Sequence, residues 1–259
     1  MNAALAGWAA FGLFVGAYGT LVGAGGGFLL VPALLWAAGV KPEVAAGTSL
    51  AVVLFNAISG TWAYARKGLV DWRTALLFAA STVPGSWLGP SLLHFVPEKG
   101  FYAAFGTLML VIAGILLLRP ASPPEGGKPR LGRGALIRGC LLSLVVGFLS
   151  SMLGIGGGVI HVPVLIYALG FPAHLAVATS HATLAFSAGV GVISHHLARH
   201  VLWDVALAAG AGALVGAQIG AALSRRAPTR LLVRLLALAI VAVGVRCLWM
   251  GLATAPASG

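Results

Sequence analysis

The stretches GAGGGFLLVP (residues 23–32) and GIGGGVIHVP (residues 154–163) decide the fold of this chain. Each lies in the middle of an apolar segment, where a glycine destabilises a helix by roughly 1 kcal/mol relative to alanine. Three consecutive glycines therefore predict a helix break inside each apolar segment, followed by a short apolar run that contains a proline. Broken helices at corresponding positions of two halves of a chain are typical of a transporter's binding site.

The composition is that of a helical membrane protein. Of the 259 residues, 59% are hydrophobic and only 8% are charged, and the mean hydropathy is +1.01. Apolar runs of about 20 residues recur along the chain, and each is long enough to cross a bilayer core as a helix. The alternation of apolar and polar residues that a membrane β-barrel requires is not seen. The net charge of +11 comes from basic residues in short loops, which the positive-inside rule explains better than nucleic-acid binding.

The chain contains an internal repeat. At an offset of 131 residues, segments 16–89 and 147–220 share 24 identities in 74 positions, against roughly 8 expected from this composition, so the similarity indicates a duplication. We expect a first repeat over 1–118, a linker rich in proline and glycine over 119–134, and a second repeat over 135–259.

Each repeat is expected to hold a broken segment (about 4–38 and about 136–169) followed by three plain spans. The second piece of each broken segment, about 12 residues long, would cover only about 18 Å as a helix and is too short to cross. Either the broken segment crosses once, or it enters the membrane and returns. The plain spans are expected at about 44–65, 72–92 and 100–118, and at about 174–195, 203–223 and 230–250.

The basic residues favour the re-entrant alternative. If the broken segments cross, the lysines and arginines divide 10 to 6 between the two sides; if they return, the division is 12 to 4, which fits the positive-inside rule better. Three crossings per repeat also invert the second copy relative to the first. We therefore expect an all-α polytopic membrane protein of two inverted-topology repeats, each a re-entrant helix plus three transmembrane helices. The linker is expected to be cytoplasmic and both termini outside.

The two glycine motifs form the candidate binding site. A re-entrant segment places free backbone N–H groups and the positive end of a helix dipole partway into the membrane, and glycine lets the backbone curl around an anion. Two such ends near the midplane predict an anion site; the alternative is that the glycines only permit close helix packing. The candidate residues are Gly25, Gly26 and Gly27 in the first motif and Gly156, Gly157 and Gly158 in the second.

Side chains that follow each motif extend the candidate site. Thr48-Ser49 and Thr179-Ser180 are paired by the repeat and lie in the first two turns of the next span. Their hydroxyl groups either donate to an anion or bond to the helix carbonyl four residues earlier. Asn56 lies two turns beyond Ser49 on a similar face and is a further candidate.

Two histidines distinguish the halves. His161 stands where the first repeat has Leu30, and His181 stands where it has Leu50. An ionisable residue inside a membrane is by default a functional hypothesis, and histidine titrates near neutral pH. These histidines either bind the anion when protonated, take part in proton coupling, or form neutral hydrogen bonds between helices. The other histidines, His195 among them, fall at span ends and are expected to be solvated.

The residues do not suggest catalysis. The five acidic residues lie at span ends or in the linker, so no buried carboxylate pair is expected, and the sequence has no HExxH motif. Cys140 and Cys247 lack the spacing of a disulfide framework or a metal site. We expect neither enzyme activity nor a cofactor.

The two motifs with their continuations, GAGGGFLLVPALL…GTSL and GIGGGVIHVPVLI…ATSH, resemble the TauE/SafE family of sulfite exporters, also called TSUP. The resemblance covers essentially the whole chain. It implies a bacterial or archaeal inner-membrane protein that moves sulfite, sulfoacetate or related sulfur-containing anions, usually outward. His161 and His181 stand where the plainer family pattern has aliphatic residues.

The sequence therefore predicts a secondary transporter with alternating access to an anion held between the glycine motifs. The alternatives are a passive anion channel and a membrane scaffold that transports nothing. The expected partners are a small anionic substrate, the lipid bilayer, a coupling proton or ion, and further copies of the chain, with no nucleic acid.

Overall fold

The computed structural model describes residues 3–118, 131–224 and 226–253, and within these ranges the chain forms helices and short connections with no strand. Eight of the described helices are long and apolar enough to cross a membrane, which confirms the expected all-α membrane fold. The first half contains α1 (Ala3–Val22), α2 (Gly27–Ala37), α3 (Pro42–Ala65), α4 (Trp72–Leu93) and α5 (Glu98–Leu118). The second contains α6 (Arg133–Leu153), α7 (Gly158–Pro163), the π-helix η1 (Val164–Ala168), α8 (Ala173–Leu197), α9 (Trp203–Ser224) and α10 (Thr229–Ala253).

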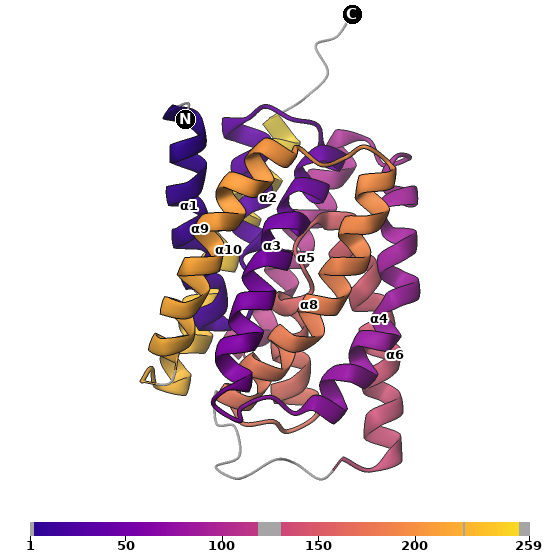
Figure 1. Ribbon diagram of the computed structural model, residues 1–259. Coiled ribbons are helices and arrows are strands. Elements are labelled where there is room, and N and C mark those ends of the chain that lie inside the picture. The colour runs from indigo at the N-terminus through magenta and orange to yellow at the C-terminus, as the bar shows by residue number, and fades with distance from the viewer. Residues whose placement is uncertain (1–2, 119–130, 225, 254–259) are drawn as a thin grey trace, which may run out of the picture.

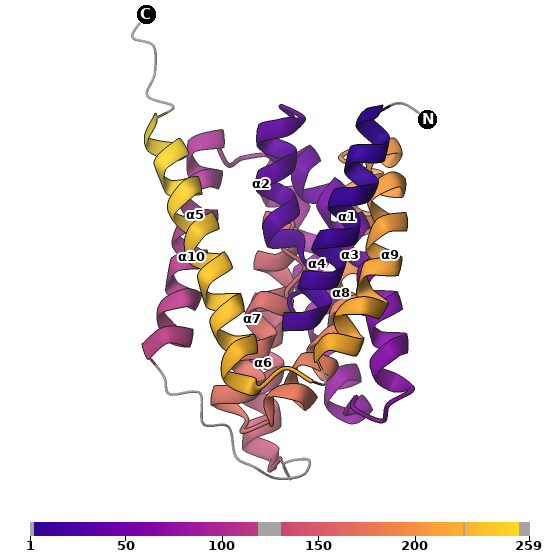
Figure 2. The same ribbon diagram turned by 90° about the vertical axis from the view of Figure 1, so that its left-hand side faces the viewer.

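Both apolar segments break at the glycine motifs, as expected. α1 ends at Val22 and α6 ends at Leu153, and in each case four residues separate this end from the start of the next helix. The short helix α2 has 11 residues, so it covers about 17 Å and cannot cross a bilayer core. Figure 2 shows that α2 leads back toward the end of the bundle at which α1 begins. This is the path expected of a re-entrant segment.

The two halves are interleaved rather than side by side. α1 of the first half packs along α9 of the second, and α6 of the second packs along α4 of the first (Figure 1). α3 packs on α8, and α5 packs on α10. Under the offset of 131 residues each of these pairings maps onto its counterpart, so the repeat found in the sequence is also a repeat of helix contacts.

Small residues allow the closest of these pairs to form. A Cβ at Gly16 of α1 would lie 2.6 Å from the Cα of Ala213 in α9, and one at Gly216 would collide with the carbonyl oxygen of Leu13. Helices α4 and α6 pack as closely as α1 and α9, because Gly147 lies against the backbone of Thr82. Helices in lipid associate through such small residues because no hydrophobic effect drives them together. These glycines, which lie outside the two motifs, therefore serve close helix packing.

The helix ends divide between the two ends of the bundle. Figure 1 shows the α3–α4 and α9–α10 connections at one end, where α6 begins, and the start of α1 with the α8–α9 connection at the other. We call the first the linker end, because α5 ends and α6 begins there. Most of residues 119–134, the predicted linker, lie outside the described residues. Inversion of the repeats, the domain boundaries and the side of the membrane that each end faces stay predictions.

Candidate functional site

The chain reverses at two tips, residues 23–26 and 154–157. At the first tip φ is +78° at Gly23, +77° at Gly25 and +82° at Gly26. The equivalent glycines of the second tip have φ of +72°, +80° and +68°. L side chains rarely adopt this left-handed conformation, which glycine adopts at no steric cost. The duplicated motif thus builds the same backbone turn twice.

The two tips pack directly against each other. A Cβ at Gly27 would lie 2.7 Å from the carbonyl oxygens of Gly154 and Ile155, and one at Gly158 would lie 2.5 Å from the carbonyl oxygen of Gly23. All of these residues are buried. Glycine at both positions is therefore required for the backbone of each half to reach the other.

The two predicted serines hold the carbonyl groups of the tips. Ser49 Oγ donates to the carbonyl oxygen of Gly154 at 2.8 Å and lies 3.4 Å from that of Gly27. Ser180 Oγ donates to the carbonyl oxygen of Gly23 at 3.3 Å. These bonds cross from one repeat to the other and replace the bonds to the preceding helical turn that the sequence allowed. Both serines position the tips; their contact with a substrate stays a prediction.

Four amide groups, at two equivalent positions of each tip, have no acceptor among the described residues. Across residues 3–118, 131–224 and 226–253, the backbone N–H groups of Gly26 and Phe28, and of their equivalents Gly157 and Val159, make no hydrogen bond. All four residues are buried. A buried N–H group without an acceptor is rare in folded proteins because it loses its hydrogen bond to water without replacement. The junction of the tips therefore presents donors whose acceptor is not part of the described chain.

An apolar pair covers the tips. A Cβ at Gly156 would lie 2.6 Å from Val53 Cγ1, and one at Gly25 would collide with the side chain of Leu184. Val53 and Leu184 are equivalent under the repeat, and both are fully buried. In this conformation the tips are closed off by one aliphatic side chain from each half.

Asn56 and His181 both contact Thr20 beside the first tip, and the three residues form one buried polar cluster. Asn56 Nδ2 donates to the carbonyl oxygen of Gly25 at 2.9 Å. Thr20 Oγ1 donates to Asn56 Oδ1 at 2.8 Å and lies 3.2 Å from His181 Nε2. Because a hydroxyl group has one proton, which Thr20 gives to Asn56, the proton of the second bond belongs to His181 Nε2. His181 Nδ1 then carries a lone pair, and it has no hydrogen-bond partner in the described part of the chain.

His161 lies at the second short helix and makes a separate contact. Its Nε2 is 3.1 Å from Ser143 Oγ of α6, and its ring stacks on Phe78 at 6.3 Å between centroids. His161 is buried, but it joins neither Thr20 nor Asn56. The structure therefore places the two predicted histidines in different surroundings.

The two predicted threonines lie away from the tips. Thr48 Oγ1 accepts a hydrogen bond from the backbone N–H of Leu202 at 3.0 Å, and Thr179 Oγ1 accepts one from Asp71 at 3.1 Å. Leu202 precedes α9 and Asp71 precedes α4, so each hydroxyl group fixes the entry of a helix from the other repeat. A direct contact with substrate stays a prediction for these two residues as well.

Replacement of Thr48 or Thr179 by valine is expected to lower the stability of the protein by about 1–3 kcal/mol, because a backbone N–H group loses its acceptor. Thermal unfolding in detergent measures this. The matched control is Thr61→Val, since Thr61 Oγ1 is buried and has no hydrogen-bond partner in the described residues. If Thr61→Val is as destabilising as Thr48→Val, the hydrogen bonds to the helix entries contribute nothing.

A second pair of equivalent contacts was not predicted. Tyr64 Oη donates to the carbonyl oxygen of Thr20 at 2.7 Å, and at the equivalent place His195 Nε2 donates to the carbonyl oxygen of Ser151 at 2.9 Å. His195 is fully buried, so the expectation that it is solvated is wrong. It lies at the last turn of α8, but α3 and α6 cover it.

Comparisons with known proteins agree with this architecture. A family model described as "Sulfite exporter TauE/SafE" matches residues 8–247. A "Probable membrane transporter protein YunE" of Bacillus subtilis is 32% identical over 93% of this chain and 96% of its own length. A "Probable membrane transporter protein" of Xylella fastidiosa is 32% identical over 88% of this chain and 89% of its own. Another, from Methanocaldococcus jannaschii, is 30% identical over 71% of this chain and 69% of its own. No solved structure is significantly similar.

The fold and the paired tips define a polytopic helical membrane protein of the transporter class. The chain belongs to the TauE/SafE sulfite exporter family, which confirms the resemblance noted in the sequence.

Proposed function

We propose that this protein is a secondary transporter, working as an exporter, of sulfite, an organosulfonate such as sulfoacetate, or a related small sulfur-containing anion. The substrate binds between the two glycine tips, and access to it alternates between the two sides of a bacterial or archaeal inner membrane. The two repeats have inverted topology in this proposal, so that each tip serves one side.

The four amide groups without acceptors are the observation that carries this proposal. At the same tips, the carbonyl groups of Gly23, Gly25 and Gly154 already accept hydrogen bonds from side chains. The tips therefore present N–H groups that are free to donate, while these carbonyl oxygens are already hydrogen-bonded. This arrangement favours an anion over a cation. An oxyanion accepts several hydrogen bonds at once and would satisfy these groups.

The closed tips favour a carrier over a channel. Val53 and Leu184 cover the tips, so an anion reaches them only after the helices that carry these side chains have moved. α3 and α8 carry one each and pack on one another. A relative rocking of the two helices would expose the tips to one side at a time, as alternating access requires. A passive channel needs a continuous polar path, which these two side chains interrupt.

His181 is proposed to couple anion movement to a proton. Its Nδ1 is buried and has no hydrogen-bond partner among the described residues, while Nε2 contacts Thr20. A proton added to Nδ1 would place a positive charge beside the first tip without breaking the bond to Thr20. The first half has Leu50 at the equivalent position, so this function belongs to one half.

Counterflow in proteoliposomes tests the proposed function. Vesicles loaded with unlabelled sulfite should accumulate labelled sulfite transiently, and sulfoacetate, thiosulfate or sulfate inside the vesicles should replace sulfite according to the selectivity of the site. A carrier gives this overshoot because the loaded site returns faster than the empty one, whereas a channel gives only equilibration. Folded, inserted protein that moves none of these anions would exclude the proposed substrate class and favour a scaffold.

A further inference from the structure

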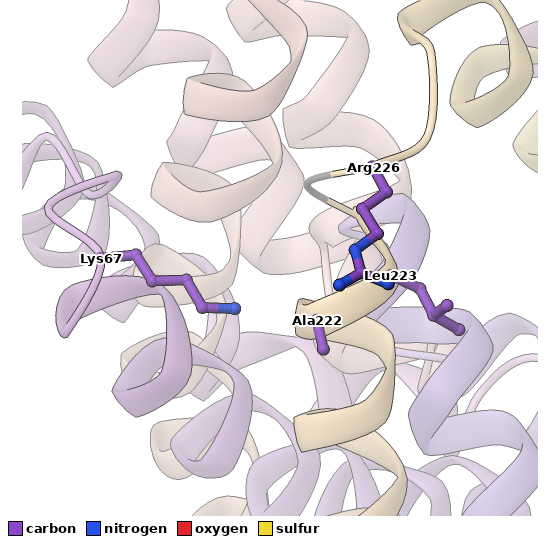
Figure 3. Close-up of a pocket in the computed structure, with 4 residues that line it drawn as sticks. All are labelled: Lys67, Ala222, Leu223 and Arg226. Atoms are coloured by element: carbon purple, nitrogen blue, oxygen red, sulfur yellow. The ribbon is translucent and has the colours of Figure 1, made fainter.

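A cavity of about 480 Å³ opens at the linker end of the bundle. It lies between the α3–α4 connection and the end of α9, and its lining residues are Lys67, Ala222, Leu223 and Arg226. Figure 3 shows Lys67 reaching from the α3–α4 connection toward the end of α9, where Ala222, Leu223 and Arg226 lie together. The described residues that line it thus include two cations.

The position of Lys67 is fixed by the fold. Its Nζ donates to the carbonyl oxygen of Ala221 at 2.9 Å, which ties the α3–α4 connection of the first half to α9 of the second. The ammonium group is therefore held at the wall of the cavity. Two positive charges in a recess with apolar walls raise the local concentration of anions, because a low-dielectric wall focuses the field.

The helices beside the cavity, α3 and α9, connect it with the first tip. Tyr64 lies in the last turn of α3, three residues before Lys67, is fully buried, and donates to the carbonyl oxygen of Thr20. Thr20 is the residue that bonds to Asn56 beside the tip. Ser224, the last residue of α9, is also buried. Tyr64 and Thr20 therefore join the end of α3 to the polar cluster beside the first tip by hydrogen bonds.

The positions equivalent to Lys67 and Arg226 lie at the opposite end of the bundle and are not cationic. Under the offset of 131 residues, Lys67 corresponds to Ala198 and Arg226 to Phe95, and both lie at the end where α1 begins. Burial lowers the pKa of the nearby His200 below its ordinary value. The end where α1 begins therefore has no cation at the positions equivalent to Lys67 and Arg226; its Arg199 follows Ala198 in the sequence.

We propose that Lys67 and Arg226 form a loading site for the transported oxyanion at the linker end of the bundle. The inference rests on the proposed function and adds a direction to it: the anion is collected at the end with the paired cations and released at the end without them. A lipid phosphate offers the same chemistry as a soluble oxyanion, so the experiment separates the two.

The test compares two double variants in oriented proteoliposomes. Lys67→Gln with Arg226→Gln removes both charges from the cavity. Arg73→Gln with Arg138→Gln removes two exposed charges from the same end without touching the cavity. We expect the first to raise the KM for sulfite about tenfold when the anion is supplied at the linker end. At the other end, KM should stay the same, and the maximal rate should stay within twofold. The control should change neither value.

Three results would overturn the loading site. One is an unchanged KM in the cavity variant, and another is an equal rise at both ends, which would indicate a general structural defect. The third is a rise only in vesicles that contain phosphatidylglycerol and not in pure phosphatidylcholine, which would assign the cations to a lipid headgroup.

A binding measurement keeps the inference testable when the parent shows no flux and the proposed function fails. Thiosulfate should raise the thermal stability of the detergent-solubilised parent more than that of the cavity variant. Equal shifts in the two proteins would overturn an anion site at the cavity.

Discussion

Alanine at position 158 is expected to destabilise the protein by at least about 3 kcal/mol, which lowers Tm by about 10 °C in a chain of this size. The added Cβ would lie 2.5 Å from the carbonyl oxygen of Gly23 and 2.9 Å from the backbone of Ala24. Backbone atoms cannot turn away as a flexible side chain would, so the two tips must separate. Gly27→Ala is expected to act in the same way, because its Cβ would meet the backbone of Gly154 and Ile155.

Thermal unfolding in detergent, followed by tryptophan fluorescence, measures the effect, and counterflow shows whether any folded protein still transports. The matched control is Gly114→Ala. Gly114 lies inside α5 with nothing within 4 Å of the new Cβ, and alanine is the better helix former. Its Tm should match or exceed that of the parent. A Gly158→Ala protein with the parent's Tm would show that the tips do not pack as described.

The helix breaks could be predicted because the signal is local. Three consecutive glycines in an apolar run destabilise a helix wherever they occur, and the observed ends at Val22 and Leu153 follow from them. The sequence repeat also predicted which residues are equivalent. Under the offset of 131 residues, the hydrogen bond from Ser49 to Gly154 corresponds to the one from Ser180 to Gly23. Sequence identity thus identified which residues would have equivalent roles.

The partners of these residues could not be predicted in the same way. Ser49 and Ser180 each reach a tip in the other half, so their acceptors depend on how the halves interleave. Thr20 carries no signal of its own, because a threonine in an apolar helix is ordinary and the repeat pairs it with Ser151 rather than with an identical residue. Only the fold brings Thr20 of α1 to Asn56 of α3 and His181 of α8.

Burial at helix ends was misjudged for a related reason. His195 lies at the last turn of α8, and position along the helix predicted that it would be solvated. Its bond to the carbonyl oxygen of Ser151 shows that a neighbouring helix covers that turn. Tyr64 at the equivalent position is covered in the same way. Tyr64 and His195 occupy equivalent positions but are different residue types. The sequence therefore did not indicate that they make equivalent hydrogen bonds.

Leucine in place of His181 is expected to reduce transport about 100-fold, equivalent to about 2.7 kcal/mol in the barrier, while the protein still folds. The substitution removes the only ionisable side chain of the Thr20–Asn56–His181 cluster and the group proposed to take up the coupling proton. Leucine already occupies the equivalent position 50, where it packs against Gly191. The apolar side chain therefore suits this fold, and the stability should fall by no more than about 1–3 kcal/mol from the lost hydrogen bond.

Counterflow and proton-driven flux, measured on the same vesicles, separate the proposed role from a structural one. If His181 carries the coupling proton, His181→Leu should lose stimulation by a pH gradient and retain slow exchange of anion for anion. If it only supports Thr20 and Asn56, both activities should fall together, and His181→Gln, which keeps a donor, should restore both. His196→Ala is the matched control, because His196 lies on the same helix and is exposed. Full pH stimulation in His181→Leu would exclude a proton-coupling role, because no protonatable side chain would then remain in the cluster beside the first tip.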